Sequence, residues 1–324
     1  MNRRQVLGAA AAAAASALLP LGLRAQGSLP DPMRIVVGFP PGGGTDMVSR
    51  LLAQKLGTRL KTSVVVENRA GAAGVIAAEY VAKQPADGSF LLMTNFSNHA
   101  VAPSLYPKLG YEVERDFTPI MLAGISPGLL VCRADQQART LPALVERCRK
   151  EPGAVSFGSA GPGSLQHLAL EMFKLRAGID AMHVPYRGSG AMMTDLLGGQ
   201  IEYSFETMTA ATPHLASGKL VAIAQTRLQR SPAQPQVPTM AESGYEGFDA
   251  STWYGLVGPA GVDAALVARL NDELNQILRE PDVIERLASV GAEDGGGSPE
   301  RFAAFIVDEK KKWAKVIEQA KVTV

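Results

Sequence analysis

The sequence has little of several features on which metalloenzymes, hydrolases and membrane proteins depend. Only two cysteines occur in 324 residues, and the four histidines are scattered without an H-x-x-x-H pair. This pattern offers no zinc site of ordinary spacing and no G-x-S-x-G turn of a serine hydrolase. After residue 25, no apolar run approaches the 18 residues that a membrane helix needs. We therefore predict no catalytic set, no metal site and no cofactor, and we do not expect an enzyme.

The chain also lacks an excess of either charge. Its formal net charge is +1 at pH 7. Loss of the first 25 residues would remove Arg3, Arg4 and Arg24 and change the charge to −2, because +1 − 3 = −2. A near-neutral protein has no electrostatic preference for nucleic acid or for an anionic membrane. We predict no nucleic-acid partner.

The N-terminus has the layout of an export signal. Two arginines, Arg3 and Arg4, precede the 18 residues from Val6 to Leu23, which are rich in alanine and leucine and contain no acidic residue. Ala25 supplies a small residue for cleavage. The start also resembles a twin-arginine signal. We predict a signal peptide over residues 1–25, a mature chain of 324 − 25 = 299 residues and a periplasmic location.

Strand and helix patterns alternate in two series, which predicts two α/β lobes with mostly parallel sheets. The first series has strands over 33–37, 63–67 and 90–93, with helices after the first two strands. The second has strands over 129–131, 155–157, 182–185 and 201–205. Segment 220–224 is expected to return toward the first lobe, and helices are expected over 263–279, 281–289 and 299–320. We predict lobe 1 over 26–125 plus 228–324, and lobe 2 as an insertion over 126–227.

The two cysteines, Cys132 and Cys148, leave two alternatives open. In an oxidising compartment they could form a disulfide between a strand and the following helix. They could equally remain buried thiols, because the sequence does not give the distance between their α-carbons.

Two glycine-rich turns are the main candidates for a binding site. Residues 39–46 (FPPGGGTD) follow the first strand and lead into a helix, for which Thr45 is an N-cap candidate. Residues 158–164 (GSAGPGS) occupy the corresponding place in the second series, with Ser164 as the cap. Glycine lets backbone amides approach a ligand, and a helix N-terminus favours an anion. Each turn could also be an ordinary strand-to-helix connection. Neither contains Lys or Arg, so binding would depend on amides, hydroxyls and water.

Other side chains are weaker candidates. Phe39 and Tyr186 flank glycine turns, where binding residues concentrate. An acid–base pair of Asp46 and Glu206, or a role for His167, would instead favour a secreted hydrolase or lyase. Acidic residues at helix starts and packed histidines are common without such a role.

Several segments, taken in order, cover essentially the whole chain after the signal peptide. They are 35–46 with Arg50, 67–74, 86–88, 103–106, 157–167, 184–189, 195–200, 218–220, 235–244, 253–256 and 259–261. Together they resemble the substrate-binding receptors of tripartite tricarboxylate transporters, the Bug family. Phe205-Glu206 departs from a more common Phe-Asp in the family, and residues 95–99 also differ in detail.

The resemblance implies a type II periplasmic-binding fold whose two lobes close on a carboxylate held by the two glycine loops. The ligand-binding residues that the resemblance implies are Gly43, Gly44, Thr45 and Asp46 from one lobe, and Ser159, Ala160, Gly163 and Ser164 from the other. We add Phe39 and Tyr186, which flank glycine turns, and Glu206, whose stretch is expected to face the cleft. The implied function is that of an extracytoplasmic receptor that delivers a small organic carboxylate, such as a dicarboxylate, to membrane permease subunits. We expect a monomer. A sensor receptor for a signalling partner is the alternative that shares every motif.

Overall fold

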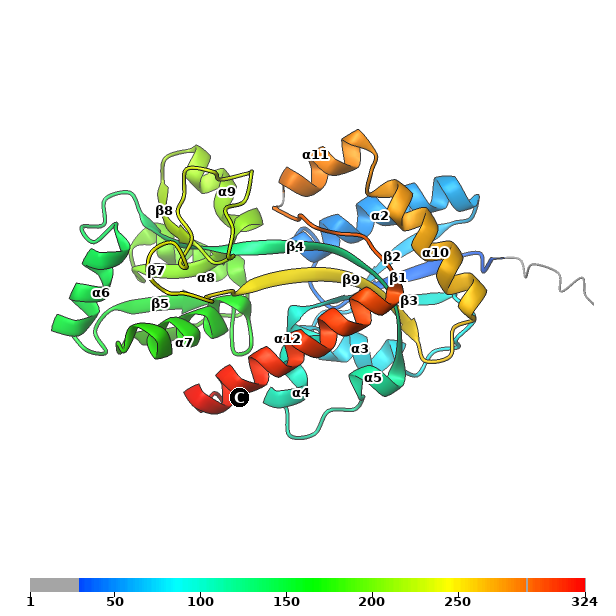
Figure 1. Ribbon diagram of the computed structural model, residues 1–324, viewed down its shortest axis with the longest axis horizontal. Coiled ribbons are helices and arrows are strands. Elements are labelled where there is room, and N and C mark those ends of the chain that lie inside the picture. Colours follow the sequence, from blue (N-terminus) through cyan, green and yellow to red (C-terminus); the bar gives the residue numbers. More distant parts are fainter. Residues whose placement is uncertain (1–28, 290, 324) are drawn as a thin grey trace, which may run out of the picture.

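The computed structural model describes residues 29–289 and 291–323 (Figure 1). The predicted signal peptide lies outside the described residues. Within them, no helix is both long and apolar enough to cross a membrane.

Strands and helices alternate along most of the chain. The strands are β1 (Met33–Val37), β2 (Val64–Asn68), β3 (Phe90–Asn95), β4 (Phe117–Arg133), β5 (Ser156–Ser159), β6 (Met182–Pro185), β7 (Tyr203–Thr207), β8 (Leu220–Gln225) and β9 (Ser251–Pro259). The helices are α2 (Gly44–Leu60), α3 (Val75–Val81), α4 (Ala102–Leu105), α5 (Val113–Asp116), α6 (Leu141–Lys150), α7 (Leu165–Ala177), α8 (Ser189–Gly198), α9 (Met208–Ala216), α10 (Ala264–Ile277), α11 (Pro281–Ser289) and α12 (Pro299–Ala320). Two short turns, the 3₁₀-helical η2 (Ala72–Gly74) and the π-helical η3 (Phe96–Val101), complete the order.

The first lobe is built on the sheet order β2-β1-β3-β9-β4, with β9 antiparallel to both neighbours. Successive side chains of a strand point to opposite faces of its sheet, and β1 is covered on both. Ile35 joins the apolar cluster that contains Leu52 of α2, whereas Val36 joins the cluster that contains Ala78 of α3. Burial on both faces explains why the consecutive residues 35–37 of this parallel strand are all apolar.

The second lobe has its own sheet, in which β7 lies between β4 and β5, and β6 pairs with β5. β8 pairs with the other edge of β4. Helix α7 covers one face, where Phe157 and Phe173 are buried together. Helices α8 and α9 cover the other face around Leu129 and Val131 of β4. The predicted two-lobe α/β architecture is confirmed. The expectation of a mostly parallel sheet in each lobe is wrong, because β4 and β9 pair antiparallel with all their neighbours and make both sheets mixed.

The 17-residue strand β4 joins the lobes. Residues 117–127 pair with β9 in the first sheet, and residues 128–133 pair with β7 and β8 in the second. Figure 1 shows β4 and β9 side by side between the two groups of helices. The expectation that segment 220–224 returns to the first lobe is wrong, because these residues form β8 in the second sheet. The returning strand is β9, which the sequence pattern did not reveal.

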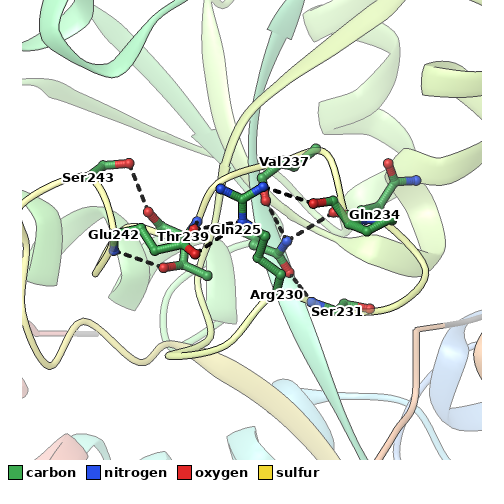
Figure 2. A network of polar contacts seen from close by, with 9 residues as sticks. Gln225, Arg230, Ser231, Gln234, Val237, Thr239, Glu242 and Ser243 are labelled. Carbon is green, nitrogen blue, oxygen red and sulfur yellow. Dashed lines mark hydrogen bonds and ion pairs between the residues drawn. The ribbon is translucent and has the colours of Figure 1, made fainter.

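The segment between β8 and β9 is held by the polar network in Figure 2. The Gln225 side chain donates to the carbonyl oxygens of Gln234 (3.1 Å) and Val237 (2.7 Å) and accepts from the Ser231 amide (2.8 Å). Farther along the segment, Tyr245 packs on Phe173 of α7 and Phe248 on Phe205 of β7. Because these contacts are with the second lobe, we propose that this lobe extends to about residue 250, beyond the predicted limit at 227.

The C-terminal helices pack around both lobes. Helix α10 lies against α2 and β4, and α12 contacts β4, η3 and α7. Buried Glu309 of α12 accepts hydrogen bonds from the indole nitrogens of Trp253 (3.2 Å) and Trp313 (3.1 Å). Helix α12 is thereby fixed to β9 of the first lobe while it contacts α7 of the second.

Candidate ligand-binding site

The first glycine turn leads directly into helix α2. Gly43 is the N-cap residue, with an extended backbone (φ −80°, ψ 170°), and no side chain caps the helix. The prediction that Thr45 is the cap is wrong: the helix begins at Gly44, and Thr45 is its second residue. A helix start without a side-chain cap retains amides that can bind an anion.

Asp46 braces this turn. Its carboxylate accepts two hydrogen bonds from the Arg50 guanidinium, one from the Gly42 amide and one from Asn68 Nδ2, each at 2.9 Å. Burial alone would raise the pKa of Asp46, but the hydrogen bonds from Arg50, Gly42 and Asn68 outweigh it and hold the pKa below 3.8. Asn68 also donates to the Phe39 carbonyl oxygen (3.0 Å). The carboxylate is therefore ionised and engaged with the protein itself.

The second glycine turn is braced in a different way. Ser164 caps α7 by accepting from the His167 amide at 3.4 Å, as predicted. The Gly163 amide donates to His167 Nδ1 (3.2 Å), and Ser159 Oγ lies 2.7 Å from His183 Nε2. The two imidazoles stack with their centroids 4.0 Å apart. Burial lowers the pKa of His167 to about 3 and that of His183 to about 4, so both rings are neutral at pH 7.

Three helix starts of the second lobe meet at Glu206, the penultimate residue of β7. Its Oε1 accepts from Gln166 in the first turn of α7 (2.9 Å) and from Ser189 at the start of α8 (3.3 Å). It also accepts from the amide (2.6 Å) and hydroxyl (3.1 Å) of Thr207, the N-cap of α9. The side chain is fully buried, and burial raises the pKa of Glu206 to about 7.

The two lobes approach each other at both glycine turns. A β-carbon added to Gly44 would lie 2.4 Å from the Tyr254 hydroxyl oxygen and 3.4 Å from Thr209 Oγ1 of α9. One added to Gly163 would lie 2.7 Å from Leu105 Cδ2 of α4. Each turn therefore faces groups of the opposite lobe, and Gly44 also faces the crossing strand β9.

The remaining candidate residues have different surroundings. The Tyr186 hydroxyl donates to Asp195 of α8 (2.7 Å), and its ring packs on the apolar cluster under α8 and α9. The Ala160 carbonyl oxygen accepts from the Gly188 amide (3.2 Å). Phe39 lies beside Gly74, whose added β-carbon would be 3.2 Å from the Phe39 ring and 3.0 Å from Asn98 Nδ2.

Sequence reasoning did not single out four polar residues near the candidate site: Gln166, Ser189, Asn98 and Tyr254. It did expect the stretch that contains Thr209 to face the region between the lobes, and Thr209 lies close to Gly44 of the first lobe. Gln166 and Ser189 stand in the first turns of α7 and α8, each of which follows a turn that contains glycine, and this position was a usable signal. Asn98 was not detectable, because it lies in the π-helical turn η3, where its Oδ1 accepts from the Asn95 amide.

Among the described residues, four buried side-chain polar atoms have no hydrogen-bond partner. They are Asn98 Nδ2, Glu206 Oε2 and both ring nitrogens of His99. His99 lies among Tyr111 and Phe117, and burial lowers its pKa to about 3. Residues 29–289 and 291–323 contain no group of three or more His, Cys, Asp or Glu side chains that could hold a metal ion. Cys132 and Cys148 are buried free thiols.

A family model described as tripartite tricarboxylate transporter family receptor matches residues 48–322. The chain belongs to this family. Protein BugT of Bordetella pertussis is 40% identical to it over 289 residues, which are 89% of either chain.

Two solved structures share both the fold and substantial sequence identity with this receptor. R. palustris Rpa4515 with adipate is 33% identical, with a TM-score of 0.85 over 90% of this chain and 98% of that one. MatC from Rhodopseudomonas palustris with bound malate is 31% identical, with a TM-score of 0.80 over 89% of this chain and 98% of that one. The family resemblance seen in the sequence is therefore confirmed, and the chain is a receptor of the tripartite tricarboxylate transporter family.

Proposed function

We propose that this receptor binds a small organic dicarboxylate between its lobes and delivers it to membrane permease subunits. The observation that carries the proposal is the placement of helix starts on both sides of the interlobe region. Helix α2 begins at Gly44 without a side-chain cap, and α7, α8 and α9 begin around Glu206. Helix starts attract carboxylates at either end of such a ligand.

The bound ligands of similar receptors support this ligand class. Rpa4515 was solved with adipate and MatC with malate, and both are dicarboxylates. In the proposed complex, Phe39, Gly43, Gly44 and Thr45 contact one carboxylate, and Ser159, Ala160, Gly163 and Ser164 contact the other. Asp46 does not contact the ligand directly, since its oxygens already accept four hydrogen bonds. It stabilises the conformation of the first glycine turn. The Tyr186 hydroxyl donates to Asp195 and is therefore not assigned to the ligand. Tyr186 stabilises the second turn, because its amide donates to the Ser159 carbonyl oxygen.

We also propose that the receptor does no chemistry on its ligand. An acid–base pair of Asp46 and Glu206 would need one carboxylate free to exchange a proton with substrate, and Asp46 is held ionised by Arg50. His167 accepts a hydrogen bond from Gly163 and stacks on His183, which fits a structural role. We propose export through the N-terminal signal and a monomeric state.

A calorimetric and thermal-shift screen tests the proposed function. Succinate, malate and adipate are titrated into the purified protein, with butyrate and 1,4-butanediol as controls that lack one or both carboxylates. A dicarboxylate at 100 times its Kd should stabilise the native protein by about 2.7 kcal/mol. The ligand should be recovered unchanged. If a neutral or cationic solute binds and no dicarboxylate does, the proposed ligand class is wrong.

A further inference from the structure

Glu206 has two carboxyl oxygens in very different surroundings. Oε1 accepts four hydrogen bonds, from the Thr207 amide and hydroxyl, Gln166 Nε2 and Ser189 Oγ, at 2.6 to 3.3 Å. Oε2 is equally buried and has no partner among the described residues. A buried polar atom without a partner costs free energy comparable to a lost hydrogen bond, so such an atom is a place where a further hydrogen-bond partner would stabilise the protein.

The difference between the two oxygens determines which of them carries the proton when the Glu206 carboxyl group is neutral. Four donors converge on Oε1, which can act only as an acceptor. A proton on the carboxyl group must then be on Oε2, which becomes an O–H donor without an acceptor. Burial favours this neutral form, in keeping with a pKa near 7.

The position of Glu206 indicates which acceptor completes the arrangement. The carboxyl group lies at the starts of α7, α8 and α9, whose partial positive charges favour an anion. Thr209, two residues after the α9 cap, approaches Gly44 of the opposite lobe. This is the region where the proposed function places a carboxylate, and a carboxylate oxygen is a strong acceptor for an O–H group.

We propose that protonated Glu206 donates a hydrogen bond from Oε2 to a carboxylate oxygen of the bound ligand, so that the receptor takes up a dianion together with one proton. This inference rests on the proposed function, and it adds that Glu206 determines specificity for an acceptor group at that position.

Several of the other titratable and charged groups around Glu206 are bonded to residues other than Glu206. On α7, His167 accepts from Gly163, and Glu171 pairs with Lys174 (3.1 Å). On α8, Asp195 binds Tyr186, and on β6, His183 binds Ser159. The elements packed around Glu206 carry four more titratable or charged side chains: Arg176 of α7, His214 in the last turn of α9, and Cys132 and Arg133 at the end of β4. Asp46 and Arg50 of the first lobe and Tyr254 of β9 lie on the opposite side of the interlobe region. No hydrogen bond or ion pair that we observe between described side chains links any of these groups to Glu206.

The proposal fixes the sign of the pH dependence. A ligand carboxylate bonded to Oε2–H raises the pKa of Glu206 in the complex, because it stabilises the protonated form. Below the pKa of the free protein, Glu206 is protonated with or without ligand, and affinity does not depend on its titration. Above that pKa, near 7, binding requires proton uptake, and affinity falls by about tenfold per pH unit.

Calorimetry between pH 6.5 and 8.5 tests the inference, with the tightest binder among succinate, malate and adipate as the probe. We expect wild-type affinity to fall at least tenfold over this range. Titrations in two buffers of different ionisation enthalpy should give close to one proton taken up per ligand at pH 8.5. In Glu206→Gln, the amide oxygen can replace Oε1 and the amide N–H can replace the Oε2 donor. Its affinity should change less than twofold across the range. Glu171→Gln, which removes a paired carboxyl group from α7, should follow the wild type.

Each outcome decides one claim. Dicarboxylate binding without proton uptake, or an unchanged pH slope in Glu206→Gln, overturns the inference and leaves the proposed function intact. Wild-type affinity that rises with pH, together with loss of binding in Glu206→Gln, also overturns it, because Glu206 would then be an ionised acceptor. Absence of dicarboxylate binding at every pH contradicts the proposed function itself. Should Glu206→Gln fail to fold, the proton count in the wild type decides alone.

Discussion

At the scale of single residues, Asp46 shows how an acidic side chain can support an anion site without repelling the anion. Its charge is matched by the Arg50 guanidinium through two hydrogen bonds of 2.9 Å, and its remaining acceptor capacity is used by Gly42 and Asn68. Asp46→Asn keeps the size of the side chain but removes the charge. We expect a loss of about 2 kcal/mol in the free energy of unfolding at pH 7, measured by urea denaturation.

The pH dependence of this loss has a defined sign. The pKa of Asp46 is lower in the folded protein than its ordinary 3.8, so its contribution is present above pH 3.8 and disappears as pH falls further. Wild type and Asp46→Asn should therefore converge in stability only below about pH 4. Asp282→Asn is the matched control, because exposed Asp282 pairs with Lys55 at the surface and should contribute less. Equal losses in the two variants at pH 7 would contradict the bracing role of Asp46.

Sequence pattern accounts for part of this arrangement. The glycine turns and the helix that follows each of them were predictable from residue types alone. Arg50 stands four residues after Asp46, a spacing that brings side chains together on a helix, so that pair was accessible too. The contribution of Asn68 was not, because it depends on the pairing of β2 with β1, which brings Asn68 opposite Val37.

At the scale of elements, the start of α2 is closely fitted to the crossing strand β9. A β-carbon at Gly44 would lie 2.4 Å from the Tyr254 hydroxyl oxygen, closer than real β-carbon contacts. In Gly44→Ala, the helix start or the Tyr254 side chain must move, which changes the surroundings of the amides proposed to bind a carboxylate. We expect dicarboxylate affinity to fall at least tenfold by calorimetry, since small misplacements of binding groups are costly.

Gly198→Ala is the control for this prediction. Gly198 ends α8, and a β-carbon there would have no heavy atom within 4 Å. Alanine is also the better helix former, so this variant should bind normally and be at least as stable as the wild type. Wild-type affinity in Gly44→Ala would show that the start of α2 is not part of the binding site.

Most elements were predictable because their apolar residues repeat with the period of one regular structure. The exceptions have physical reasons. β9 contains two glycines, which face Phe302 and Val262 closely, and this composition does not indicate a strand. β8 is an ordinary apolar strand, and only its pairing with β4 shows that it remains in the second lobe. Chain pattern gives the type of an element more readily than its partner.

At the scale of the whole molecule, the two lobes share much of their interior. One apolar cluster includes Phe96 and Trp313 from the first lobe and its C-terminal helix, and Leu165 and Phe173 from α7 of the second. Strands β4 and β9 connect the lobes as a paired ribbon, and α12 contacts α7. Separate unfolding of either lobe would expose this common cluster to water.

We therefore expect the receptor to unfold in a single cooperative transition, although two-lobe proteins often do not. Differential scanning calorimetry should give one endotherm whose van't Hoff and calorimetric enthalpies agree. A dicarboxylate at 100 times its Kd should move that whole endotherm upward by about 5 °C, because about 2.7 kcal/mol of binding free energy stabilises only the native state. Two separate transitions, with only one of them responding to ligand, would show that the lobes are energetically independent. The ligand would then be held mainly by one lobe, and helix starts from both sides would not be acting on it together.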